Sequence, residues 1–284
     1  MTSRSSRRPG AGRSPRGPRA KKRFGQHFLS DRGILDRIAD AGELDRDDTV
    51  IEVGPGLGAL TEVLAERVSR VIAVEVDRDL IAGLRERFRA SPHVAVVEAD
   101  VLDKSPDGLL AAGRAAAPYV VVANLPYNIA AAVLRHFLES AHPPKRLVVM
   151  VQLEVAEAIV ARPGRMSLLS VATQVYGIAT MVMRVAPGAF HPPPAVQSAV
   201  VRIDVAPAPR VDVPLDVFFR IVRAGFGNPR KQLRNSLSFG LHVTQTVVDD
   251  VMHDAGIDVT LRAQVLSLDD WASLTRAWIE AIRR

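Results

Sequence analysis

The amino-acid sequence predicts an α/β fold in which a doubly wound parallel sheet precedes a smaller all-helical domain. Up to about residue 205, short runs of β-branched residues alternate with segments of helical periodicity, a pattern typical of parallel strands joined by helices. A glycine-rich turn, Gly54-Pro55-Gly56-Leu57-Gly58, directly follows an early strand. From Leu215 onward the apolar residues recur only at helical spacing, so a second, helical domain is expected.

The individual elements follow from short apolar runs and from helical spacing. The predicted strands cover residues 49–53, 70–75, 94–100, 119–123, 146–151, 179–185 and 198–203. A helix of about ten residues is predicted from Arg32, and further helices over residues 60–68, 78–89, 130–140, 154–161 and 168–176. Residues 22–29 are interpreted as a lead-in to the first helix. The last two strands are expected to form an antiparallel hairpin at the edge of the sheet.

The charge distribution and a proline-marked linker divide the chain into three parts. Residues 1–23 hold nine cations and no acid, which leaves 28 of the 37 basic residues against 31 acidic ones in the rest. We therefore predict a disordered basic tail (1–20), which either binds a polyanion or stays solvated. The α/β domain is expected over residues 21–205 and the helical domain over residues 210–284.

Composition also restricts the class of protein. The chain has 284 residues, of which 48% are apolar, enough for two domains with real cores. No apolar run is long enough to span a membrane, and the arginine-rich start lacks the apolar segment of a secretory signal. The absence of cysteine excludes disulfides and thiolate metal ligands and fits a cytoplasmic location. No metal site is expected.

The glycine turn indicates a nucleoside-binding site. Between a strand and a helix, such a turn lets the backbone approach a ligand closely, and Glu75 lies about twenty residues on, where an acid commonly binds a ribose diol. These two features fit both NAD and S-adenosylmethionine. A tight turn without a ligand is the remaining alternative.

Three acids favour the methyl donor over the dinucleotide. Glu52, Glu75 and Asp100 stand near the ends of three successive predicted strands, and such a cluster suits a ligand that carries a sulfonium and an ammonium group. A dinucleotide site would instead favour positive charge near the pyrophosphate. Taken singly, each acid could also be a helix cap or a solvated turn residue.

The tetrapeptide Asn124-Leu125-Pro126-Tyr127 supplies features suited to an acceptor base. It follows a buried strand, so it is expected at the carboxyl edge of the sheet. The Asn124 side-chain oxygen and the Leu125 carbonyl can accept both protons of an exocyclic adenine amine, which raises the nucleophilicity of its nitrogen. Tyr127 can stack on the base. Catalysis would then be positioning for an in-line displacement, without a general base of unusual pKa.

Together these motifs resemble the ribosomal RNA adenine N6-dimethyltransferase family, and within it the small-subunit (16S) enzymes. The resemblance extends from about residue 21 to Asn235. Its motifs are Phe24-Gly25-Gln26-His27-Phe28-Leu29, Glu52-Val53-Gly54-Pro55-Gly56-Leu57-Gly58, Glu75, Asp100, Asn124-Leu125-Pro126-Tyr127-Asn128-Ile129, Met150-Val151-Gln152, Leu169-Ser170-Val171, Ala189-Phe190-His191-Pro192-Pro193-Pro194 and Arg230-Lys231-Gln232-Leu233-Arg234-Asn235.

The resemblance implies a Rossmann-like S-adenosylmethionine-dependent methyltransferase domain and an rRNA substrate in the immature small ribosomal subunit, methylated by a monomeric enzyme. The implied donor-binding residues are His27, Leu29, Gly54, Gly56, Glu75, Asp100 and Asn124. The implied catalytic residues are Asn124, Leu125, Pro126 and Tyr127.

Basic residues of the helical domain are the candidates for RNA contact. No acid occurs from Val217 to Val248, and the segment also carries Phe218, Phe219 and Phe226. This composition suits the phosphates of a folded RNA, or else a solvated helix face with its phenylalanines packed inward. The candidate residues are Arg220, Arg223, Arg230, Lys231 and Arg234.

Several positions depart from the family pattern. His27 stands where Asn is frequent, Leu153 and Ala158 replace an expected Lys and Arg, Met166-Ser167 replaces a tyrosine-glycine pair, and Pro229 replaces an Arg. The change at His27 concerns an implied contact to the donor, whereas those at Leu153, Ala158 and Met166-Ser167 concern RNA contact rather than methyl transfer. The alternatives are a macrolide-resistance methyltransferase of 23S rRNA, a mainly non-catalytic assembly factor of the small subunit and, third, a nicotinamide oxidoreductase.

Overall fold

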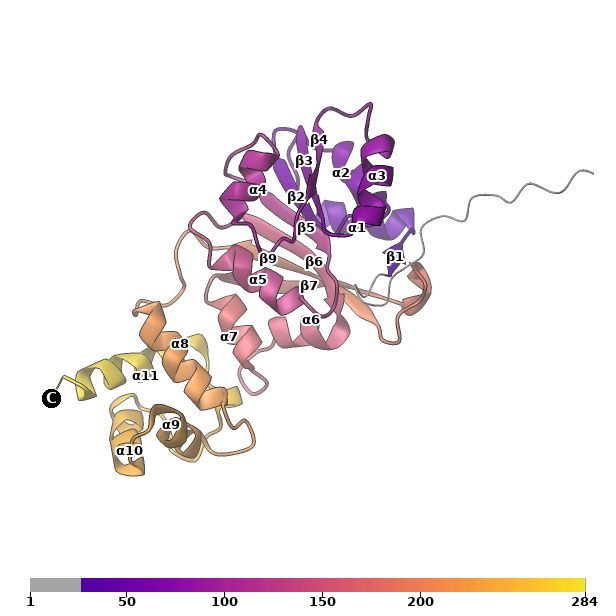
Figure 1. Cartoon of the computed structure of the whole chain (residues 1–284). Helices are drawn as coiled ribbons and strands as arrows, with labels where there is room; N and C mark the ends of the chain where they lie inside the picture. The colour runs from indigo at the N-terminus through magenta and orange to yellow at the C-terminus, as the bar shows by residue number, and fades with distance from the viewer. Residues whose placement is uncertain (1–26, 284) are drawn as a thin grey trace, which may run out of the picture.

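The computed structural model describes residues 27–283. The predicted basic tail (1–20) therefore lies outside the described residues. The described chain forms a layered α/β part and a group of helices beyond α7 (Leu168–Gln174) (Figure 1). None of the described helices combines the length and the apolar character needed to cross a lipid bilayer.

A seven-stranded sheet forms the centre of the α/β part, in the order β4-β3-β2-β5-β6-β9-β7. The strands from β4 to β6 are parallel, whereas β9 pairs antiparallel with both β6 and β7. The antiparallel pair predicted at the edge is therefore present. The strands are β2 (Thr49–Val53), β3 (Arg70–Glu75), β4 (Val94–Glu98), β5 (Val120–Asn124), β6 (Arg146–Gln152), β7 (Gly177–Val185) and β9 (Ser198–Val205).

Both faces of the sheet are covered by helices, because successive strand residues point to opposite sides. Val50 packs with α1 and α2 on one face, and Ile51 packs with α4 and α5 on the other. The helices of this part, besides α7, are α1 (Arg32–Ala41), α2 (Ala59–Ala65), α3 (Arg78–Arg87), α4 (Pro106–Ala112), α5 (Ala130–Leu138) and α6 (Leu153–Ile159).

The structure corrects the sequence prediction in two places. Residues 22–29 were expected to lead into a helix, but Phe28–Leu29 forms strand β1, which pairs antiparallel with β8 (Phe190–His191) after the short helix η2 (Pro187–Ala189). Helix α4 was not predicted. It is short and contains a glycine, and it is defined chiefly by Ser105, whose side chain caps its first turn, and by burial of Leu109 and Leu110.

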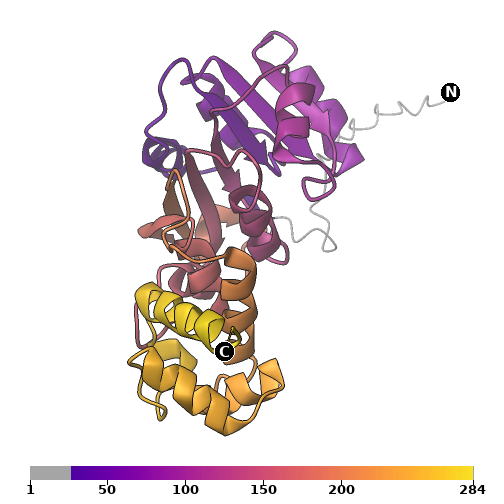
Figure 2. The same cartoon turned by 90° about the vertical axis from the view of Figure 1, so that its left-hand side faces the viewer.

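The carboxyl-terminal part is helical, as predicted, and has its own core around the fully buried Trp271. Val171 and Val175 of α7 belong to the same core, so this part packs directly on the α/β part, as Figure 2 shows from the side. Its elements are α8 (Leu215–Phe226), α9 (Leu233–Leu241), α10 (Gln245–Asp254), the short helix η3 (Ala263–Val265) and α11 (Leu268–Ala281).

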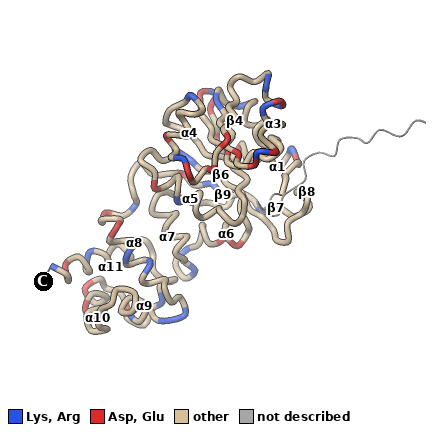
Figure 3. The backbone as a smooth tube through the Cα atoms, viewed as in Figure 1, with Lys and Arg blue, Asp and Glu red and all other residues tan. Residues whose placement is uncertain are grey.

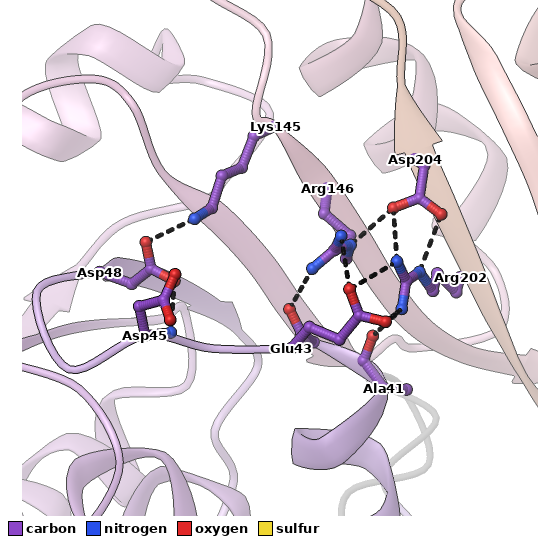
Figure 4. Close-up of polar contacts among 9 residues, drawn as sticks. Ala41, Glu43, Asp45, Asp48, Lys145, Arg146, Arg202 and Asp204 are labelled. Carbon is purple, nitrogen blue, oxygen red and sulfur yellow. Dashed lines mark hydrogen bonds and ion pairs between the residues drawn. The ribbon is translucent and has the colours of Figure 1, made fainter.

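A network of ion pairs joins the end of α1 to strands β6 and β9 at the amino edge of the parallel strands (Figure 4). Arg146 contacts Asp204 (Nε to Oδ1, 2.6 Å), Glu43 (3.0 Å) and the Gly42 carbonyl (2.6 Å). Arg202 bonds both oxygens of Glu43 and both of Asp204. The network fixes α1 to the sheet, and α1 directly follows β1.

Asp204 gives a test of this network. Partial burial alone would raise the pKa of its carboxyl, but hydrogen bonds from Arg202 and Arg146 outweigh burial and lower it. We expect Asp204→Asn to reduce the free energy of unfolding at pH 7 by about 1 kcal/mol, since the carboxylate is 41% exposed and solvent screens it. The depressed pKa means that this contribution is present above the ordinary Asp pKa and disappears as the pH falls through the native value. Chemical denaturation at several pH values measures both effects.

Asp212→Asn is the matched control, because Asp212 pairs with Arg276 at 81% side-chain exposure. It should change stability by a few tenths of a kcal/mol. Equal effects of the two substitutions would contradict a structural role for the network.

Candidate functional site

A cavity of about 690 Å³ opens at the carboxyl ends of the parallel strands. Its walls come from β1, from the glycine turn after β2, from the ends of β3 and β4, and from the turn between β5 and α5. In open α/β sheets this edge is where ligands bind. All predicted donor-binding and catalytic residues line this cavity: His27, Leu29, Gly54, Gly56, Glu75, Asp100, Asn124, Leu125, Pro126 and Tyr127.

The glycine turn has the backbone that only glycine adopts without strain. Gly54, Gly56 and Gly58 all have positive φ, at 68°, 59° and 82°. A Cβ on Gly56 would lie 3.1 Å from the ring of Phe28 in β1. The turn therefore lies tightly between β1 and the cavity.

The Glu75 carboxylate fixes this turn from the neighbouring strand. One oxygen accepts hydrogen bonds from the backbone N–H groups of Val76 (3.0 Å) and Asp77 (2.8 Å), and the other from that of Gly56 (3.2 Å). Burial raises the pKa of Glu75, and these three donors partly offset that effect. The oxygen bonded to Gly56 can accept one further bond, whereas the other oxygen already accepts two.

The three acids differ in their surroundings more than the sequence suggested. Asp100 lies beyond the end of β4 and is exposed, with one oxygen bonded to the Leu102 N–H (2.9 Å). Glu75 ends β3. Glu52 lies inside β2 and is only 1% exposed, so it is neither a helix cap nor a solvated turn residue. All three nevertheless line the same cavity.

The turn after β5 is held by three hydrogen bonds. The Leu125 N–H donates to the Met150 carbonyl (3.1 Å), the Asn124 side-chain amide to the His27 carbonyl (3.3 Å), and the Tyr127 hydroxyl pairs with Ser198 (2.7 Å). The Asn124 amide nitrogen is thus used by the protein, which leaves the side-chain oxygen as an acceptor.

His27 packs against the turn rather than standing free in the cavity. Its Nδ1 lies 2.8 Å from the Pro192 carbonyl, so this nitrogen carries the proton. Its ring is stacked on Tyr127, with centroids 5.7 Å apart and an interplanar angle of 24°. One face of the tyrosine ring is therefore covered. Leu29 is buried in the core beside α1, and part of it reaches the cavity.

The predicted RNA-contact residues fall into two groups. Arg220, Arg223, Arg230 and Lys231 are exposed, whereas Arg234 pairs with Asp249 of α10 at 2.6 Å. The sequence did not indicate this ion pair, because Asp249 lies one position beyond the acid-free segment from Val217 to Val248. The phenylalanines of α8 belong to the core: Phe218 and Phe219 are buried and Phe226 packs on Trp271. This favours the alternative in which the aromatic rings point inward.

Sequence reasoning missed three further cations beside this group. Arg162 and Arg165 flank the turn between α6 and α7, and Arg262 precedes η3; all three are exposed. Backbone N–H groups of Gly164 (2.9 Å) and Met166 (3.0 Å) donate to the Gln264 carbonyl, which brings the turn beside Arg262.

A further backbone bond, from the Leu233 N–H to the Leu261 carbonyl (2.7 Å), brings Arg230 and Lys231 to the same place. Figure 3 shows basic segments gathered where α7, α8 and α9 meet. We call this group the basic ridge. Its members are Arg162, Arg165, Arg230, Lys231 and Arg262. Among the described residues, none of their side chains forms an ion pair. Only the local sequence Arg162-Pro163-Gly164-Arg165, a charged turn, could have indicated its first members.

Comparison with known proteins identifies relatives over nearly the whole chain. The family model described as "Ribosomal RNA adenine dimethylase" matches residues 17–279. "Ribosomal RNA small subunit methyltransferase A" of Dehalococcoides mccartyi (strain CBDB1) is 46% identical over 90% of this chain and 87% of its own length. The protein of the same name from Geobacter metallireducens is 43% identical over 92% of this chain and 96% of its own length.

Two solved structures share the fold. The structure of the 23S rRNA methyltransferase ErmE has a TM-score of 0.70 and 29% sequence identity to this chain. The match covers 88% of this chain and 98% of the ErmE chain. A dimethyladenosine transferase from Plasmodium falciparum has a TM-score of 0.75 at 22% identity, covering 90% of this chain and 98% of its own.

The conformation of the glycine turn can be tested by single substitutions. We expect Gly56→Ala to lower the free energy of unfolding by about 1–2 kcal/mol, because alanine at positive φ is strained and its Cβ contacts Phe28. Gly83→Ala is the control: Gly83 lies within α3 with open space around it, so alanine there should stabilise by about 0.5–1 kcal/mol. Denaturant titration distinguishes the two, and a stabilised Gly56→Ala variant would contradict the turn geometry.

Proposed function

Because this chain belongs to the ribosomal RNA adenine dimethylase family, we propose that it transfers methyl groups from S-adenosylmethionine to the N6 amines of two adjacent adenines in 16S rRNA of the immature small ribosomal subunit. The observation that carries the proposal is the cavity that joins the glycine turn to Asn124-Leu125-Pro126-Tyr127. The relatives named as small-subunit enzymes are 38–46% identical to this chain, against 29% for the 23S enzyme, which favours the 16S substrate.

The residues around the cavity fit the methyl donor. Gly56 lets the backbone approach the ligand, the free acceptor site of the Glu75 carboxylate suits a ribose hydroxyl, and the exposed Asp100 carboxylate suits the adenine amine. His27, Leu29, Gly54 and Asn124 would complete the donor site. When bound, S-adenosylmethionine supplies a methyl group activated by its sulfonium.

The turn after β5 would hold the acceptor adenine. The Asn124 side-chain oxygen and the Leu125 carbonyl would each accept a proton of the N6 amine, which localises the nitrogen lone pair for attack. Since His27 covers one face of the Tyr127 ring and Ser198 fixes its hydroxyl, the adenine would stack on the opposite face. Pro126 fixes the turn.

The chemical step needs no strong base. The N6 nitrogen attacks the methyl carbon in line, the carbon–sulfur bond breaks, and its electron pair goes to sulfur. The methylated nitrogen is then acidic enough to lose its proton. The protein's contribution would be orientation of the two groups and exclusion of water, which account for large rate enhancements when the reacting atoms are held in contact. A second round on the same nitrogen requires only that product and donor exchange.

Selection of the RNA would depend on the helical domain and the basic ridge. An adenine within a folded RNA has to leave its stack to enter the cavity. Unpaired cations along the ridge suit the phosphates on either side of it. We propose residues 21–205 as the methyltransferase domain and 210–284 as the RNA-binding domain. Arg162 and Arg165 would add to the RNA contact from the first domain, and Arg234 less so, because Asp249 holds it.

Two substitutions of Tyr127 distinguish the contribution of ring stacking from that of the hydroxyl contact with Ser198. We expect Tyr127→Ala to slow dimethylation of immature small subunits at least about 100-fold, since the base loses its support. The control Tyr127→Phe keeps the ring and loses only the Ser198 contact, so it should retain most of the activity. Incorporation of labelled methyl groups from S-adenosylmethionine measures both.

Three outcomes of this experiment would contradict parts of the proposal. Unlabelled small subunits with the wild-type protein would refute the function, and labelling of 23S rRNA alone would support the macrolide-resistance alternative. Rescue of subunit assembly by an inactive Tyr127→Ala protein would support the assembly factor.

The basic ridge predicts a change in salt dependence. We expect the double variant Arg162→Gln, Arg165→Gln to bind immature small subunits more weakly, with a slope of log affinity against log salt smaller by about 1–2. The control is Arg46→Gln, Arg114→Gln, two exposed arginines that form no ion pair among the described residues and lie at the opposite, amino edge of the sheet. Filter binding over a salt series measures the slopes. Equal slopes for the two variants would remove the ridge from the RNA interface.

A further inference from the structure

Glu52 is a carboxyl group buried beneath the cavity with no partner for one of its oxygens. Its side chain is 1% exposed, and Oε2 forms no hydrogen bond within the described part of the chain. The strand residues on either side of it are Ala73 and Val122. Leaving such an acceptor unsatisfied is costly unless the group is neutral or a ligand completes its contacts.

Within the described part of the chain, the hydroxyl of Thr61 in α2 lies close to the Glu52 carboxyl. This hydroxyl lies near enough to lower the pKa of Glu52, yet neither Thr61 Oγ1 nor Glu52 Oε2 reaches hydrogen-bond geometry in the described residues. Both groups are therefore buried with unused hydrogen-bonding capacity, and Glu52 lies at one wall of the cavity.

Of the described residues, two cations line the cavity, and neither is available to Glu52. Arg32 is engaged by Asp36 and Glu66. Arg87 is engaged by Glu62 and by the Leu57 carbonyl.

The other titratable groups that the structure describes around the cavity give Glu52 no positive partner either. His27 is bonded to the Pro192 carbonyl, Tyr127 to Ser198, and Asp100 is an exposed acid. Glu75 is a like charge nearby. Burial, with a smaller effect of Glu75, raises the pKa of Glu52 to about 8.

We propose that Glu52 carries a proton in the free protein and releases it when the cationic methyl donor binds, so that donor binding is coupled to the loss of one proton. This inference rests on the proposed function, because it requires S-adenosylmethionine as the ligand. The donor carries a sulfonium, an ammonium and a carboxylate, a net charge of +1. Its positive charge offsets the cost of a buried carboxylate and shifts the equilibrium to the ionised form.

The same coupling gives the protein different affinities for the donor and for the product. Methyl transfer converts the sulfonium into an uncharged thioether, and the reaction's own proton leaves from N6 of the adenine. The product thus has no net charge, and Glu52 regains its proton from solvent when the product is bound or has left. Donor binding is therefore favoured over product binding, increasingly so as the pH rises.

Calorimetry tests the coupling directly. Binding heats are measured at pH 7 in two buffers of different ionisation enthalpy, which gives the number of protons released. We expect nearly one proton per S-adenosylmethionine and clearly less for S-adenosylhomocysteine. A donor analogue with an amine in place of the sulfonium should behave like the donor. The donor affinity should rise about tenfold between pH 6 and pH 7, the slope of one released proton.

Glu52→Gln keeps the shape and stays neutral, so its donor binding should release no proton and lose the pH dependence. Glu62→Gln is the matched control, a cavity-lining residue that forms an ion pair with Arg87, and it should behave like wild type. Thermal unfolding without ligand gives a second test, which does not depend on donor binding by the Glu52→Gln variant. The wild-type melting temperature should fall relative to that of Glu52→Gln between about pH 5 and 8, because the native state binds the extra proton in that range.

The outcomes separate the inference from the function. Absence of donor binding by the wild-type protein would refute the proposed function. Donor binding without proton release, or with equal release in Glu52→Gln, would refute the coupling alone. Parallel melting curves of the two proteins across this pH range would refute the protonated state of free Glu52.

Discussion

The contact between the Glu75 carboxylate and the Gly56 N–H is the constraint on which the rest of the cavity depends. It joins the end of β3 to the turn that follows β2, two segments that parallel pairing alone leaves free at their carboxyl ends. With the turn fixed in this position, Phe28 packs against Gly56, and β1 is held at the cavity wall. A carboxylate at this place therefore orders the backbone of the site and still presents one lone pair to a ligand.

Sequence reasoning found the parts of the fold that are encoded locally. The strands β2, β3 and β6 are runs of apolar, mostly β-branched residues, and this composition identifies them as buried strands. The glycine turn is recognised from its position after β2 and from its spacing to Glu75. The pairing of β1 with β8 escaped it, because each strand has two residues and the partners are more than 160 positions apart. Tertiary contact alone defines such a strand.

The same limit applies to the site. The acids of the cavity could be named from their positions after strands, but the burial of Glu52 depends on which face of β2 it occupies and on α2 above it. Likewise the engagement of Arg234 and the gathering of the basic ridge depend on contacts between distant segments. Charge counted along the sequence gives the sign of a surface, whereas folding decides which charges are free to use.

The hydrogen bonds from Gly164 and Met166 to Gln264 have a consequence for the order in which the protein becomes competent during its own synthesis. The residues that line the cavity, with the Ser198 that fixes Tyr127, have all been translated well before position 264 emerges. The basic ridge cannot be assembled until that position and the helices around it are available. A nascent chain would thus complete the cavity first and the basic ridge, the proposed RNA contact, only after residue 264 has been made.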